Sequence, residues 1–250
     1  MSVTATRPSV GSGARAAGTE VALFGGCRVE HDGTPVPLPV GGRRLVAYLA
    51  LQGRTSRHAV AGTLWSDAAE LQAAGSLRST LWRVQRARPG LVRDVGGVLA
   101  LSPDVRVDVR GFAASARRVV DDEAPFPRDF DAVLRAGELL PGWYDDWVLF
   151  ERERLRQLRL HALDVIALAW SQAGRHGEAL DVALRALGGD PLRESAYRTV
   201  IVLHLAESNL VEAVRTYRRC RDVLATELGV PPSPDTGALL ARAGVDPAAL

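Results

Sequence analysis

The sequence predicts a mainly α fold with a small amount of β structure. An N-terminal winged helix-turn-helix domain precedes a C-terminal all-α, tetratricopeptide-like helical repeat domain. Three observations predict this fold. Residues 20–110 change between strand and helix periodicity in the order hairpin, three helices, hairpin. From residue 145 onward nearly every segment has a helical pattern, and similar residues recur 34 positions apart, which is the period of tetratricopeptide helix pairs.

The 250 residues are enough for two domains of modest size. We expect a disordered leader over 1–19, the winged helix over 20–110, a linker with one short helix over 111–142, and the helical repeats over 143–250. The leader is rich in Gly, Ala, Ser and Thr and has no apolar core segment, so a signal peptide is not predicted.

The first hairpin is predicted from the apolar runs 21–30 and 36–40, with Asp32 and Gly33 in the turn. Prolines flank the second run. Because proline cannot donate a backbone hydrogen bond, that run is expected at the edge of a sheet.

Three helices are expected next, over 43–51, after Ser56, and over about 74–88. Ser56 suits the N-cap of the second helix, since its hydroxyl can accept a hydrogen bond from a free backbone N–H. Gly62 weakens that helix, because glycine loses more backbone entropy on folding than other residues.

The second hairpin, the wing, is predicted from the apolar runs 91–95 and 98–101. Gly96 and Gly97 lie between them. A two-residue hairpin turn needs positive φ at both positions, which two glycines provide. An extended run over 105–109 then ends the domain.

The C-terminal half is predicted to be helical. Helices are expected over 147–173, 177–187, 192–206, 210–228 and 235–243, and a short helix is expected near Phe130, after a cluster of prolines. The repeat pairs Gly174, Glu178, Ala179 and Leu180 with Ser208, Glu212, Ala213 and Val214.

The third helix is the strongest functional signal. At about 100° per residue, Leu77, Leu81 and Val84 share one apolar face. The opposite face, called the basic face below, carries Arg78, Ser79, Trp82, Arg83 and Arg86. No acidic residue occurs between positions 73 and 88, whereas a solvated helix face usually mixes charges. This pattern is typical of a helix that enters the major groove of DNA, where arginine contacts guanine or phosphate. A merely solvated face is the alternative.

The charge distribution supports a nucleic-acid partner. Residues 1–110 hold 14 Arg against 8 Asp and Glu, whereas residues 111–250 hold 17 Arg against 21. A basic half attracts a phosphate backbone. On the wing we expect Arg93, Gly96 and Gly97 to approach DNA, and Arg43 and Arg44 at the start of the first helix to meet phosphate.

Other chemistry is not indicated. Cys27 and Cys220 are too far apart in sequence for a metal motif or a disulfide framework, and the five histidines show no metal-ligand spacing. No apolar run is long enough to span a membrane. We therefore expect a cytoplasmic protein that is not an enzyme, with no cofactor, no metal and no membrane partner.

Three segments resemble the Streptomyces antibiotic regulatory proteins, which join an OmpR-like winged helix to a bacterial transcriptional activation domain. Residues 77–86 (LRSTLWRVQR) resemble the family pattern Leu-Arg-Thr-x-Leu-Ser-Arg-Leu-Arg-Arg, with Trp82 replacing Ser and Gln85 replacing Arg. Residues 139–147 followed by 151–155 resemble the start of the activation domain, and 227–232 resemble its end. The resemblance covers about residues 20–243.

The resemblance implies a transcriptional activator of a biosynthetic gene cluster, typically for a secondary metabolite. It implies binding to direct repeats in a promoter, one protomer per repeat, and leaves a homodimer on DNA open. It also implies a loop that contacts RNA polymerase. That loop would contain Trp65, Ser66, Asp67 and Glu70.

Two alternatives remain open at this point. Helical repeats commonly bind proteins, so the chain could be an interaction scaffold in which the winged helix docks a protein. A repressor with the same DNA-binding half is the other alternative, and a promoter reporter separates it from an activator.

Overall fold

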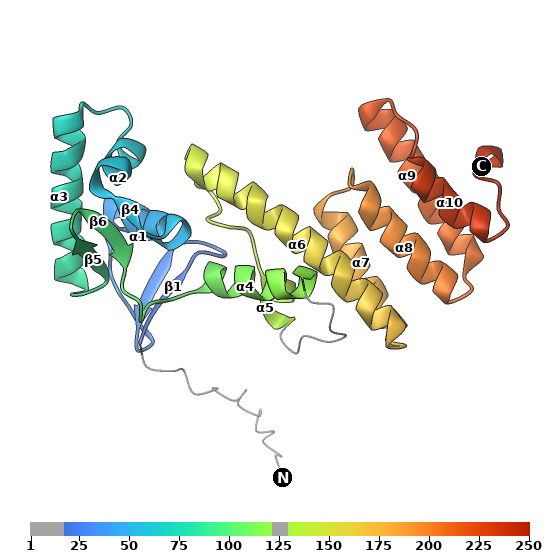
Figure 1. Ribbon diagram of the computed structural model, residues 1–250, viewed down its shortest axis with the longest axis horizontal. Coiled ribbons are helices and arrows are strands. Elements are labelled where there is room, and N and C mark those ends of the chain that lie inside the picture. The colour runs from blue at the N-terminus through green and yellow to red at the C-terminus, as the bar shows by residue number, and fades with distance from the viewer. Residues whose placement is uncertain (1–17, 122–129) are drawn as a thin grey trace, which may run out of the picture. The chain divides into compact units, whose positions relative to one another are not determined.

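The computed structural model describes residues 18–121 and 130–250 (Figure 1). The chain divides into two compact units, residues 1–110 with 138–143 and residues 111–137 with 144–250. Two expectations fall partly outside the described residues: the disordered leader, of which 1–17 are not described, and the proline cluster of the linker, which lies within 122–129.

A four-stranded sheet opens the N-terminal unit, in the order β3-β2-β1-β7. Its strands are β1 (Thr19–Ala22), β2 (Arg28–His31), β3 (Thr34–Pro35) and β7 (Arg106–Val107). β1 is antiparallel to β2, with Val21 opposite Val29, and parallel to β7. The chain therefore returns after about 85 residues to complete its first sheet, which no local pattern indicates.

The first hairpin differs in part from the prediction. The turn at Asp32 and Gly33 forms as expected, with φ of +49° and +78°. However, the run 21–30 is two strands rather than one, because Gly25 and Gly26 adopt positive φ and reverse the chain. The run 36–40 is not a strand: the partner of β2 is the two-residue β3, and Val40 already begins a helix.

Three helices follow: α1 (Val40–Gln52), α2 (Arg57–Leu64) and α3 (Glu70–Ala87). Ser56 caps α2 as predicted, since its Oγ accepts a hydrogen bond from the backbone N–H of Ala59 at 3.2 Å. α3 begins at Glu70, four residues earlier than expected, so Glu70 belongs to its first turn and not to the preceding loop.

The buried stripe of α3 consists of Ala73, Leu77, Thr80 and Val84. Leu81, which the periodicity placed on the apolar face, is only half-buried. Thr80 lies in the core instead because α1 approaches closely there: a Cβ added to Gly41 would lie 3.4 Å from Thr80 Oγ1.

The wing forms as predicted, from β5 (Val92–Val95) and β6 (Val98–Leu101) in antiparallel register. Gly96 and Gly97 have φ of +60° and +80°. A short strand that the sequence did not indicate, β4 (Thr55–Ser56), pairs with β6 and gives a three-stranded sheet in the order β4-β6-β5. In Figure 1, α3 runs beside this sheet.

The remaining elements are helical. They are α4 (Asp108–Asp121), α5 (Asp131–Arg135), α6 (Asp146–Gln172), α7 (His176–Gly189), α8 (Glu194–Ala206), α9 (Leu210–Leu228), α10 (Pro234–Arg242) and the 3-10 turn η1 (Pro247–Ala249). The helix α4 occupies residues that we expected to be an extended run and a linker. Its signal is present in the sequence, since Val109, Phe112, Ala116 and Val119 are spaced three or four apart and are buried.

The helix pairs α6–α7 and α8–α9 repeat the same turn. Gly174 and Ser208, 34 residues apart, both have positive φ, at +77° and +58°. The next residue donates an equivalent hydrogen bond in each pair, from Arg175 N to Trp170 O at 2.9 Å and from Asn209 N to His204 O at 2.8 Å. The repeat seen in the sequence is therefore a repeat of backbone geometry.

An ion pair joins the two helix pairs in their interior. The carboxylate of Asp164 on α6 accepts a hydrogen bond from Arg193 at 3.0 Å, and the hydroxyls of Ser195 and Thr199 each donate to it at 3.3 Å. Burial raises the pKa of Asp164, and the guanidinium of Arg193 opposes that rise.

Candidate nucleic-acid interface

The packing of α3 determines which of its side chains face solvent. Its buried stripe contacts α1 and α2, and a Cβ on Gly42 of α1 would lie 3.1 Å from Val84 Cγ2. Because the two helices approach this closely, α3 cannot rotate without a clash. All five residues of the basic face are consequently exposed.

The side chains of the basic face are available to a ligand. Within the described residues, Arg78 and Arg83 have no carboxylate partner. The guanidinium of Arg86 lies over the indole of Trp82, with 5.5 Å between its Cζ and the ring centroid. Trp82 is nevertheless 61% exposed. The face is thus a set of cationic donors around one apolar ring.

The wing is attached to the helix-turn-helix by Asp94. Its carboxylate forms an ion pair with Arg57, the first residue of α2, and accepts a hydrogen bond from Gly97 N at 3.1 Å. In addition, Arg57 N donates to Gly97 O at 2.9 Å. These bonds hold the glycine turn of the wing against the start of α2. Sequence reasoning missed Asp94, because its ion-pair partner Arg57 lies 37 residues away.

Arg93 projects from the wing beside residues that the sequence did not connect with it. A hollow of about 540 Å³ is lined by Arg54, Arg93 and Arg110, with Val95 and Val98 among its apolar residues. Arg110 is bound to the carbonyls of Ala50 and Leu49 at 3.2 Å each. Arg54 and Arg93 are both exposed.

Arg43 and Arg44 differ in exposure and in their contacts. Arg43 is exposed, whereas Arg44 donates a hydrogen bond to the carbonyl of Leu64 at 3.1 Å, at the end of α2. A guanidinium bound to a terminal helix carbonyl satisfies an acceptor that the helix itself leaves open. The two adjacent arginines, which we grouped as phosphate contacts, therefore have different environments.

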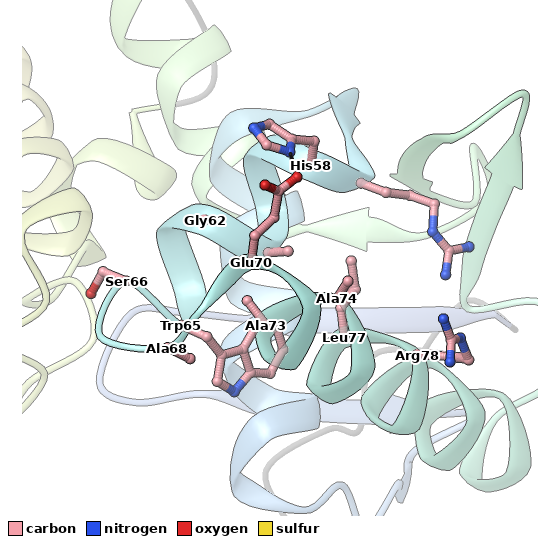
Figure 2. A pocket seen from close by; sticks show the side chains of 12 residues that line it. His58, Gly62, Trp65, Ser66, Ala68, Glu70, Ala73, Ala74, Leu77 and Arg78 are labelled. Carbon is pink, nitrogen blue, oxygen red and sulfur yellow. Dashed lines mark ion pairs between the residues drawn. The ribbon is translucent and has the colours of Figure 1, made fainter.

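The turn between α2 and α3 borders a cleft of about 430 Å³. Figure 2 shows His58 and Glu70 facing one another across it, with 3.5 Å between His58 Nδ1 and a carboxylate oxygen of Glu70. Trp65 contributes its ring to the lining, and Leu77 and Arg78 line the side formed by α3.

Three of the four residues predicted for the polymerase-contacting loop lie in this turn, and they differ in exposure. Ser66 and Asp67 are exposed and Trp65 is half-buried. Glu70, as the first residue of α3, lies favourably for the helix dipole, whose positive end attracts a carboxylate.

Cys27 is the titratable group in the N-terminal unit with the largest described shift. Burial raises the pKa of its thiol to about 11, against the opposing effect of Arg43. Among the described residues, no three His, Cys, Asp or Glu side chains are grouped so as to hold a metal ion. In the same part of the chain, no helix combines the length and apolarity needed to cross a bilayer.

Comparison with known proteins finds similarity in both sequence and fold. The family model described as the bacterial transcriptional activator domain matches residues 129–242. The regulatory protein AfsR of Streptomyces griseus is 29% identical over 214 residues, which cover 79% of this chain and 21% of that protein. AfsR of Streptomyces coelicolor is 30% identical over 208 residues, covering 76% and 20%. The chain thus spans about a fifth of the length of these relatives.

A solved structure has the same fold. It is that of Mycobacterium tuberculosis EmbR in complex with a low-affinity phosphopeptide, with a TM-score of 0.76 and 23% sequence identity. The match covers 90% of this chain and 64% of EmbR. Such a match extends over both units, so the expected combination of a winged helix with a helical domain is confirmed.

Proposed function

We propose that the chain is a sequence-specific DNA-binding transcriptional activator of the type of the Streptomyces antibiotic regulatory proteins, supported by the match of its helical half to the bacterial transcriptional activator domain and by its similarity to AfsR. The observation that carries the proposal is the exposed basic face of α3. α3 enters the major groove, where the guanidinium of an arginine can bind O6 and N7 of guanine with two parallel hydrogen bonds. Arg78 and Arg83 have no intramolecular carboxylate among the described residues to compete with DNA.

The wing supplies contacts to the DNA backbone in this proposal. Gly96 and Gly97 form a tip without side chains, and Arg93 lies beside Arg54, which adds a residue to the predicted set. Arg43 remains a phosphate contact at the start of α1. We assign Arg44 a structural role instead, since its guanidinium binds the end of α2.

The activator part of the proposal concerns RNA polymerase. The exposed turn residues Ser66 and Asp67, with Trp65 and Glu70 beside them, form the polymerase contact. One protomer binds each direct repeat of the promoter, a homodimer assembles on the DNA, and the controlled genes are a biosynthetic cluster for a secondary metabolite. The protein acts in the cytoplasm and performs no catalytic step.

DNA binding is tested by fluorescence anisotropy. Duplexes enriched from a random-sequence library, and promoter fragments from the gene's own neighbourhood, are compared with scrambled DNA at two salt concentrations. We expect Arg83→Ala to weaken specific binding roughly 5- to 150-fold, the equivalent of one base contact. The matched control is Arg218→Ala. This variant removes the same charge from an exposed position on α9 and should bind DNA as the wild type does. Equal, salt-sensitive binding to all duplexes would contradict sequence-specific recognition and favour the scaffold alternative.

Activation is tested separately with a promoter reporter. Wild type should raise transcription, whereas a repressor would lower it. Asp67→Ala should reduce transcription while anisotropy shows unchanged DNA binding, because Asp67 is exposed in the turn and outside the basic face. A loss of DNA binding in this variant would show that the turn contacts DNA instead.

A further inference from the structure

Trp82 is chemically unlike the rest of the basic face. Its neighbours on that face are three arginines and a serine, and it alone presents a large apolar surface, 61% exposed. It follows Arg78 by four positions and precedes Arg86 by four, so the three side chains form one row along the helix. An apolar ring therefore lies between two cations on the surface that faces DNA in the proposed function.

The contact with Arg86 orders this row. The guanidinium carbon lies 5.5 Å from the centroid of the indole, within the range in which a cation is attracted to an aromatic ring. The interaction restricts the rotamers of both side chains before any ligand binds. The N–H groups of the Arg86 guanidinium can still donate hydrogen bonds to a ligand, because an aromatic ring does not accept them as a carboxylate would.

We propose that Trp82 is a specificity-determining residue that contacts the C5-methyl group of thymine in the major groove. The inference rests on the proposed function. Thymine is the one base whose major-groove edge presents an apolar group, so it is the feature an exposed indole on a major-groove helix can bury. An indole has a single N–H donor, which makes it a poor phosphate ligand beside three arginines.

The neighbours of Trp82 extend this assignment. Arg78 and Arg86 flank the ring along the helix axis and contact guanine or phosphate on either side of the thymine. The preferred site accordingly contains a thymine within the segment covered by α3, and Trp82 selects it by burial of a methyl group and not by a hydrogen bond.

The test replaces thymine with deoxyuridine, which removes only the methyl group. In the duplex that binds most tightly after selection from the random library, each thymine is replaced singly. For the wild type we expect at least one position at which affinity falls about fourfold, the equivalent of one buried methyl-sized group. Trp82→Ser should bind the original duplex more weakly and show no difference between thymine and deoxyuridine at that position.

Phe150→Ala is the matched control. Phe150 is a 71% exposed aromatic residue on α6, outside the basic face, so its loss should leave the preference for thymine unchanged. Circular dichroism of Trp82→Ser should equal that of the wild type, because the indole is mostly outside the core.

The outcomes separate this inference from the function it rests on. Specific binding that is insensitive to deoxyuridine at every position overturns the role of Trp82 and leaves the regulator intact. A thymine preference that persists in Trp82→Ser does the same. Absence of specific binding to any duplex overturns the proposed function and the inference together.

Discussion

Removal of the Asp164 carboxylate probes what holds the two helix pairs of the C-terminal unit together. The side chains of Asp164 and Arg193 are only 11% and 17% exposed. Asp164→Ala removes the ion pair and two hydroxyl hydrogen bonds, and leaves the guanidinium of Arg193 without its carboxylate in a largely buried position.

The magnitude follows from that burial. Loss of one partner of a buried pair costs about 3–5 kcal/mol, because the other charge stays desolvated. Arg193 keeps a hydrogen bond to Ser195 Oγ at 2.7 Å and some contact with water, so we expect the lower end, about 3 kcal/mol. With a urea dependence of about 2 kcal/mol per molar, the unfolding midpoint of this unit should fall by about 1.5 M.

Urea unfolding is monitored by hydrogen exchange of peptides from α6 and α8. Because both helices belong to the C-terminal unit, their exchange reports on the unfolding of this unit alone. Asp181→Ala is the matched control, since the pair of Asp181 and Arg185 is 61% and 52% exposed and should contribute less than about 0.5 kcal/mol. The double variant Asp164→Ala/Arg193→Ala should lose less than the sum of the single variants. If Asp164→Ala shifted the midpoint no more than Asp181→Ala, the assigned role of the buried pair would be refuted.

Three further outcomes are expected. Ser56→Ala should destabilise the N-terminal unit by about 1 kcal/mol in thermal unfolding, because the N–H of Ala59 loses its cap; a Thr variant that failed to restore stability would argue against capping. Gly62→Ala should stabilise the N-terminal unit by about 0.5–1 kcal/mol, because the added Cβ would have no atom within 4 Å. Gly42→Ala should not stabilise it, because its Cβ would crowd Val84 of α3. Equal shifts of the melting temperature in the two variants would contradict the close packing of α1 and α3. Partial burial raises the pKa of the Cys27 thiol to about 11, so alkylation of the Cys27 peptide by iodoacetamide should be slow at pH 8 and faster as pH rises toward 11; alkylation of that peptide at the rate of the urea-unfolded protein would contradict the raised pKa.

Local patterns were sufficient wherever one element carries its own signal. Gly96 and Gly97 predict a tight turn because few other residue pairs adopt positive φ twice, and Ser56 predicts a helix start because its hydroxyl reaches a free N–H. The 34-residue repeat was visible for the same reason, since one turn geometry recurs at Gly174 and Ser208. The exposure of the basic face also follows from helical periodicity alone.

Two errors concern segments whose signal the sequence does contain. The run 21–30 divides into two strands at Gly25 and Gly26, and residues with helical spacing form α4 where a linker was expected. Asp108 at the start of α4 accepts hydrogen bonds from Leu23 N and Phe24 N, 85 and 84 residues earlier, and burial raises the pKa of its carboxyl. The helical spacing within 105–121 predicts the helix itself, but it does not indicate these distant partners of Asp108.

The sequence by itself determined the fold class, the order of a winged helix and a helical half, and the five side chains on the exposed face of the third helix. Those properties depend on residue type and on the fixed 3.6-residue period of a helix. Only the tertiary structure decided that Thr80 replaces Leu81 in the core, that Asp94 ties the wing to α2, and that Arg44 serves a helix end while Arg43 remains exposed. Each of these depends on which distant backbone or charge comes within hydrogen-bonding or packing distance, and that distance exists only once the chain has folded.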